Sequence, residues 1–164
     1  MRILVIAIAT AIHLFPHPFG VSSIGALALY AGAHGPFRTA WLVPFIPLTL
    51  AAAVFGPYDV TVMAFVFAGY SAATIAGRWF LKRERGYGRF VGAVTTGAFI
   101  FYLVSNFSNW LVGYYPPTVA GLADCYLMGL PYLGQSMFAD AAYCFVLFGV
   151  HRVLERRHSA AVPA

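Results

Sequence analysis

The stretch "VGAVTTGAFIFYLVSNFSNWLVGYY", residues 91–115, contains no charged side chain and is long enough to cross a lipid bilayer as one helix. A transmembrane helix needs about 20 predominantly apolar residues. Near its end, the stretch carries four polar side chains within "SNFSNW", residues 105–110. An amide that faces hydrocarbon loses its hydrogen bonds at a cost of several kcal/mol. These side chains must therefore face another helix or a water-filled cavity.

The rest of the chain is similarly apolar. Of its 164 residues, 61% are hydrophobic, 17% are aromatic and only 9% are charged, and the mean hydropathy is +0.78. Soluble domains carry about 25% charged residues, so a soluble protein of this size could not shield these apolar runs from water. The composition predicts an all-α integral membrane protein surrounded by membrane lipids. Nucleic acid is not expected as a partner, because the sequence offers no basic, solvated face.

Apolar runs predict six transmembrane helices in one domain over residues 1–158, followed by a flexible tail at 159–164. The predicted spans cover about 3–16, 23–37, 39–55, 59–80, 89–113 and 132–154. The first is expected to be retained rather than cleaved as a secretory signal. "HGPFR" predicts a tight break, and Pro44 and Pro47 are expected to bend the third span because proline removes a backbone donor. Residues 114–131 are expected to form a long loop with a short apolar piece.

Basic residues orient these spans. With six spans, Arg2, Arg38, the cluster at 82–89 and the arginines at 152–157 all fall on one side of the membrane. The connections on the opposite side hold no lysine or arginine. Because cytoplasmic loops are enriched in these residues, we expect a multi-pass protein of the bacterial inner membrane with both termini in the cytoplasm.

Polar residues inside the predicted spans are the candidates for function. Asn106 and Asn109 lie on nearly the same helical face, where they either bond a neighbouring helix or line a ligand cavity that opens outward. Asp140 lies inside the sixth span, with Gln135 about one turn nearer the outside. Intramembrane carboxylates are rare and usually functional, so Asp140 either fixes helix packing through hydrogen bonds or binds a ligand or proton. Asp59 is expected to be an N-cap.

Metal binding and catalysis find little support in the sequence. His13 and His17 are four residues apart, but Pro16 separates them and no clear third ligand follows. Cys125 could bind a metal or react as a thiolate, although the neighbouring Asp124 disfavours the thiolate. No Ser-His-Asp order, phosphate-binding loop or zinc-protease motif is present. We therefore predict no enzyme, no cofactor and no metal site, with His13, His17 and Cys125 left open as ligands.

Three segments resemble an uncharacterised bacterial family of membrane proteins: "PFGVSSIGALALYAGA" at 18–33, "SNFSNWLVGYYPPTVAGLADCYLMGLPYL" at 105–133 and "FADAAY" at 138–143. That family in turn is similar to the substrate-binding S components of energy-coupling-factor vitamin transporters. The resemblance covers about residues 10–150. It implies a six-helix bundle with both termini inside, in agreement with the topology predicted from charge.

The resemblance also implies a site. In S components an outward-facing pocket is built by the later helices and covered by outer connections. The positions implied here as substrate-binding are Asn106, Asn109, Asp140, Gln135, Tyr58 and Phe19. Helix one of S components docks the energising transmembrane subunit through an alanine motif, and Ala7 and Ala11 match its spacing.

We therefore expect a membrane-embedded binder of a vitamin or cofactor-like small molecule, the substrate-specificity part of a transporter. No nucleotide-binding motif is present, so transport would require energising subunits. The alternative is a structural or accessory subunit of a larger membrane complex. A solute binder should keep a polar internal cavity, whereas a packing subunit should be filled inside.

Overall fold

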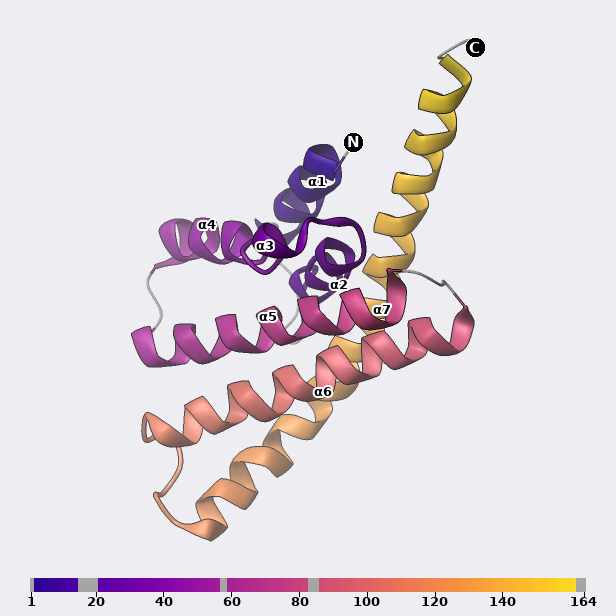
Figure 1. Cartoon of the computed structure of the whole chain (residues 1–164). Helices are drawn as coiled ribbons and strands as arrows, with labels where there is room; N and C mark the ends of the chain where they lie inside the picture. Colours follow the sequence, from indigo (N-terminus) through magenta and orange to yellow (C-terminus); the bar gives the residue numbers. More distant parts are fainter. Residues whose placement is uncertain (1, 15–20, 57–58, 83–85, 162–164) are drawn as a thin grey trace.

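The computed structural model describes residues 2–14, 21–56, 59–82 and 86–161. Seven helices and no strand occur within these ranges (Figure 1). Their bounds are α1 Arg2–Leu14, α2 Ile24–His34, α3 Phe37–Ala40, α4 Phe45–Phe55, α5 Val60–Leu81, α6 Tyr87–Leu111 and α7 Val119–Ala161. The prediction of an all-helical protein is confirmed for this part of the chain.

Four segments are long and apolar enough to cross a membrane. They are Arg38–Phe55, Val60–Leu81, Tyr87–Leu111 and Val119–Arg157. The apolar helices α1 and α2 are shorter. Together these lengths and compositions indicate a helical membrane protein.

Proline and glycine divide the chain where the sequence predicts. Gly35 and Pro36 separate α2 from the four-residue helix α3. The third predicted span is interrupted before α4, which begins directly after the buried Pro44. Pro47 lies in the first turn of α4, where a backbone N–H has no partner inside the helix. At Asp59 the predicted cap is confirmed, because one carboxylate oxygen accepts hydrogen bonds from the two backbone N–H groups of Thr61 and Val62.

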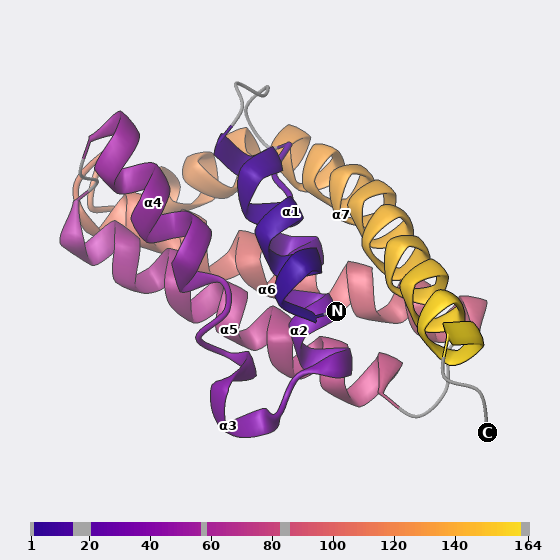
Figure 2. The same ribbon diagram turned by 90° about the horizontal axis from the view of Figure 1, so that it is seen from above.

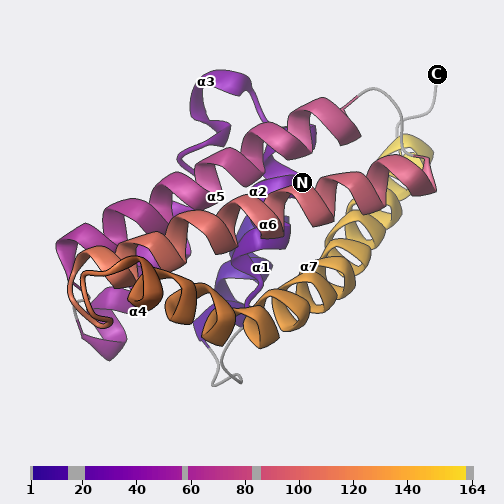
Figure 3. The same cartoon turned by 90° about the horizontal axis from the view of Figure 1, so that it is seen from below.

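The predicted loop at 114–131 is wrong from residue 119 onward. Helix α7 starts at Val119 and continues for 43 residues with Pro131 inside it. It packs against α6 and then extends beyond the other helices toward the C-terminus (Figures 1 and 3). Contacts with α6 stabilise the first turns of α7. The two helices lie so close together there that a Cβ at Gly129 would overlap the Asn106 side chain. That packing offsets the backbone hydrogen bond that Pro131 removes.

Helix α2 lies at the centre of the molecule. Every residue from Ile24 to Ala33 is buried. Helices α5 and α7 pack against it, and α1 lies across α2, α4 and α7 (Figure 2). The crossing of α2 and α5 is close, because a Cβ at Gly32 would overlap the Thr74 carbonyl oxygen and a Cβ at Gly77 would overlap that of Leu29. Two helices approach this closely only where one of them presents a glycine.

A buried polar chain joins α2 to the second half of α7. The Tyr30 hydroxyl lies 2.8 Å from Nδ1 of His151, and Nε2 of the same ring lies 2.8 Å from a carboxylate oxygen of Glu155. The Tyr30 ring also stacks on His34, with ring centroids 4.5 Å apart. Tyr30 and His151 are 1% and 3% exposed, so the hydrogen bond between them is shielded from water, whereas the Glu155 side chain is 48% exposed.

Replacing Tyr30 with phenylalanine is expected to lower the free energy of unfolding by about 1–3 kcal/mol, because Nδ1 of the buried His151 loses its partner. Unfolding of the protein in nanodiscs, followed by tryptophan fluorescence, measures this loss. Tyr87→Phe is the matched control, since the Tyr87 side chain is 85% exposed. Equal unfolding midpoints for the two variants would contradict the assignment.

Candidate functional site

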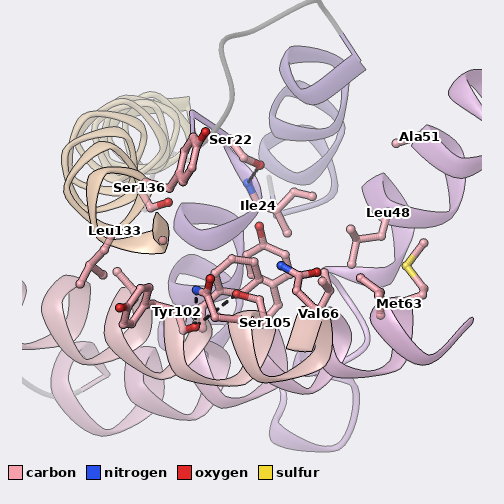
Figure 4. A pocket seen from close by; sticks show the side chains of 18 of the residues that line it. Ser22, Ile24, Leu48, Ala51, Met63, Val66, Tyr102, Ser105, Leu133 and Ser136 are labelled. Carbon is pink, nitrogen blue, oxygen red and sulfur yellow. Dashed lines mark hydrogen bonds between the residues drawn. The ribbon is translucent and has the colours of Figure 1, made fainter. Parts of the chain in front are cut away.

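A pocket of about 670 Å³ lies among the helices (Figure 4). All the long helices contribute side chains to it. Its polar lining residues are His13, Ser22, Tyr70, Tyr102, Ser105, Asn106, Asn109, Tyr115, Tyr132 and Ser136. Its apolar lining residues are Ile24, Leu48, Ala51, Val62, Met63, Val66, Ala98, Phe101, Met128, Gly129 and Leu133. This volume falls within the range of about 300–1,000 Å³ found for small-molecule sites.

The pocket lies toward one end of the helix bundle. The start of α5 and the end of α6 lie at that end, and the end of α5 and the start of α6 lie at the other (Figure 1). Val62 lies in the first turn of α5, Asn109 in the last turn of α6, and Tyr115 in the α6–α7 connection. Lys82 and Arg89 flank the opposite connection. The pocket is therefore remote from the basic end of the molecule.

The residues of α6 that line the pocket recur at helical spacing. Tyr102, Asn106 and Asn109 are three or four residues apart and share one face. Ser105 lies beside Tyr102 in the pocket wall (Figure 4). The helix ends just beyond Asn109, because Gly113 adopts a φ of +88° and the backbone N–H of Tyr114 bonds to the Asn109 carbonyl at 3.1 Å. This helix-ending pattern needs a residue with positive φ and suits glycine. It fixes the backbone from which the Asn109 side chain enters the pocket.

The two asparagines differ in their hydrogen bonding. Asn106 donates from Nδ2 to the Tyr102 carbonyl at 2.8 Å, and its carboxamide packs directly against Gly129 of α7. The Cys125 thiol donates to the Asn106 carbonyl at 3.2 Å. Asn109 is half-buried, and no described residue hydrogen-bonds its carboxamide. Asn106 thus joins α6 to α7, whereas the Asn109 amide is available to a solute.

Hydrogen bonds fix the wall between α6 and α7. The Tyr102 hydroxyl donates to the Tyr126 carbonyl at 2.6 Å, and the Tyr126 hydroxyl donates to the Leu103 carbonyl at 2.9 Å. Trp110 Nε1 donates to the Pro116 carbonyl at 3.0 Å. These bonds cross from one helix to the other or to the connection between them. The side of the pocket that carries Asn109 is therefore held in a single arrangement.

Asp140 lies beneath the pocket and contacts α2. A smaller crevice of about 20 Å³ contains Asp140 and shares part of the pocket lining, including Tyr70 and Ser136. The carboxylate accepts a hydrogen bond from the backbone N–H of Ala26, in the first turn of α2. It also contacts Gly25 so closely that a Cβ there would overlap it. An anion is favourable at a helix N-terminus, whose backbone N–H groups lack partners within the helix.

This carboxylate takes the place of an ordinary cap. Ser23 precedes α2, but its hydroxyl donates to the Ala9 carbonyl at 2.9 Å instead of capping the helix. Of the two interpretations left open for Asp140, the contacts favour helix packing. Asp140 thereby fixes α2 against α7 below the pocket floor.

A short polar chain borders the floor of the pocket on the α1 side. The Ser22 hydroxyl lies 3.3 Å from Nδ1 of His13 and forms a side-chain hydrogen bond with Tyr70. Ser22 also accepts a hydrogen bond from the backbone N–H of Ile24 at 3.2 Å. Helix α1, the segment that precedes α2, and helix α5 therefore each supply a polar group at this edge. These groups are hydroxyls and one imidazole, which suit hydrogen bonding to a solute.

The remaining predicted residues are distributed as follows. Gln135 is exposed and lines neither cavity. Tyr58, Phe19 and the possible ligand His17 lie outside the described residues. Ala7 and Ala11 are both exposed on α1, on the face opposite the buried Val5 and Ala9. Among the described residues, no three His, Cys, Asp or Glu side chains are arranged to hold a metal ion.

Several lining residues were not identified from the sequence. Tyr70 and Phe101 lie in uninterrupted apolar runs, and nothing in the sequence distinguishes them from core residues. Tyr102 could have been found, because it extends the polar face of Asn106 and Asn109 by one turn.

Comparison with known proteins gives one result. Residues 1–162 match a family described as DUF6580, a family of unknown function. The chain belongs to the DUF6580 family. No curated protein and no solved structure matches it. The family description for DUF6580 names no transporter, so the similarity to S components stays a prediction.

Proposed function

We propose that this DUF6580 protein binds a small molecule in the pocket between its transmembrane helices. The observation that carries this proposal is the Asn109 carboxamide, which lines a cavity of about 670 Å³ and has no hydrogen-bond partner among the described residues. A polar group is costly to leave unpaired in an apolar setting. Water or a polar solute in the pocket would satisfy it.

The proposed topology has six spans in the bacterial inner membrane, with both termini in the cytoplasm. Its support is the distribution of charge, since Lys82 and Arg89 lie at the end of the bundle opposite the pocket. Lysine and arginine concentrate on the cytoplasmic side of membrane proteins. The pocket would then face the outside of the cell, which suits capture of a solute.

As a proposed transporter part, the protein would depend on a partner for energy. Ala7 and Ala11 lie on an exposed stripe of α1 together with Ile3, which is 83% exposed. Small residues at this spacing permit close approach of another helix. Transmembrane energising subunits are the partner that we propose for this stripe.

The test uses the full chain in nanodiscs, incubated with a polar small-molecule extract of bacterial cells, washed and then denatured. Compounds released on denaturation are identified by liquid chromatography and mass spectrometry. We expect the wild type to release at least one compound that Asn109→Leu retains at less than about a tenth of that level, because the substitution removes both hydrogen-bonding groups. Thr95→Leu is the control on α6, since Thr95 is exposed and lies outside the pocket.

Equal retention by Asn109→Leu and the wild type would overturn the proposed site. Release of no compound from the wild type would favour the alternative, an accessory subunit of a membrane complex. Large hydrophobic side chains on the surface, such as Phe145 at 81% exposure, are compatible with lipid or with protein neighbours and do not favour that alternative by themselves.

A further inference from the structure

Aromatic rings and thioethers make up much of the pocket lining. Tyr70 and Phe101 stack on each other with ring centroids 4.3 Å apart, and both also line the crevice beneath. Tyr102, Tyr115 and Tyr132 line the side nearer the α6–α7 connection, with Met63 and Met128 as further lining residues. Aromatic pairs favour offset-stacked and edge-to-face contacts with other rings, and methionine sulfur also favours aromatic partners. This lining suits a planar aromatic molecule better than a flexible polar one.

The aromatic lining is a first condition on the bound molecule, and the charge of the lining residues sets a second. None of its described lining residues is Lys, Arg, Asp or Glu, and His13 is already close to Ser22. Asp140 lies in the crevice beneath, where its carboxylate is bonded to the α2 backbone. A carboxylate or phosphate placed in the pocket would lose its hydration without gaining a cationic partner.

Hydrogen bonding sets a third condition. The carboxamide of Asn109 presents one acceptor and two donors at the α6 wall of the pocket. An amide-like edge, with a donor beside an acceptor, can form two parallel hydrogen bonds to it. Ser105 adds a hydroxyl one turn away on the same helix, where it donates at 3.5 Å to the Tyr102 carbonyl and can still accept.

From these three conditions we infer that the pocket binds an uncharged, planar aromatic molecule that carries an amide-like edge directed at Asn109. The inference rests on the proposed function and specifies its solute class. The ring lies against the aromatic lining that includes Tyr70 and Phe101, and the amide-like edge pairs with the Asn109 carboxamide. A carboxylate in place of the amide removes the donor and introduces an uncompensated charge.

A matched set of probes tests each condition. Naphthamide has the ring and the amide, naphthoate replaces the amide with a carboxylate, and decahydronaphthalene carboxamide keeps the amide on a saturated ring. Equilibrium dialysis against the full chain in nanodiscs measures the dissociation constants, with empty nanodiscs correcting for partition into lipid. Each probe is measured with the wild type, Asn109→Leu and the control Thr95→Leu.

We expect naphthamide to bind the wild type at least about tenfold more tightly than either naphthoate or the saturated amide. Its affinity should fall about tenfold or more in Asn109→Leu and stay unchanged in Thr95→Leu. Equal or tighter binding of naphthoate would overturn the charge condition, and equal binding of the saturated amide would overturn the aromatic condition. If no probe binds but a compound is still released from the wild type on denaturation, the inference fails while the proposed function stands. If neither is found, both fail.

Discussion

Gly77→Leu is expected to lower the free energy of unfolding by about 3 kcal/mol or more. A Cβ at this position would overlap the carbonyl oxygen of Leu29 and approach its Cα within 2.7 Å. Both atoms belong to the backbone of the fully buried helix α2, so no side-chain rotation relieves the overlap. Overpacking a core usually costs about 1–3 kcal/mol, and separating two backbones places this substitution at or above the upper end. Size-exclusion chromatography in mild detergent, with unfolding in nanodiscs, measures the loss.

Gly149→Leu is the matched control for Gly77→Leu. Gly149 also lies inside a helix, but a Cβ there meets nothing within 4 Å. We expect Gly149→Leu to elute as the wild type does. An unchanged unfolding midpoint for Gly77→Leu would show that the close crossing of α2 and α5 does not exist.

Substitutions at Asp140 are expected to show whether its carboxylate caps helix α2 or binds a ligand. Leucine has as many side-chain heavy atoms as aspartate but no acceptor, so Asp140→Leu removes the bond to the Ala26 N–H without leaving a cavity. A buried donor left unpaired costs about 1–3 kcal/mol. Asparagine can still accept from the same N–H, so Asp140→Asn should retain most of the stability. Hydrogen exchange at the first amides of α2, together with the unfolding midpoint, measures both effects.

Solute release adds a second readout for the same variants. Because Asp140 lies below the pocket floor and is bonded to backbone, Asp140→Asn should release the same compound as the wild type. Loss of that compound with unchanged stability would assign Asp140 to binding. Unchanged hydrogen exchange at α2 in Asp140→Leu would instead contradict its role as a cap.

Features set by local chemistry were predicted well from the sequence. The break at Gly35–Pro36 and the cap at Asp59 follow from the restricted backbone of proline and from a short carboxylate at a helix start. The third span was expected to bend at Pro44 and Pro47, and the structure instead interrupts it between Ala40 and Phe45. The start of α7 was not predicted. Residues 119–131 contain two glycines and a proline, which disfavour a helix, and the close contact of Gly129 with Asn106 packs them against α6.

The sequence predicted the site residues that lie together on α6, but not their contacts with other helices. The polar spacing in "SNFSNW" identified Asn106 and Asn109, and both line the pocket. Their different hydrogen bonding depends on Gly129 and Cys125 of another helix, which no spacing within α6 reveals. Likewise, the contact of Asp140 with α2 joins residues more than a hundred positions apart.

Native mass spectrometry of the intact protein, gently extracted from its own membrane, shows whether the pocket holds a solute. We expect a reproducible small added mass on the wild type and on Thr95→Leu, absent from Asn109→Leu. A solute-binding pocket would be contradicted if all three proteins showed only the mass of the bare chain. It would also be contradicted if the chain were released from the membrane only together with large stoichiometric subunits.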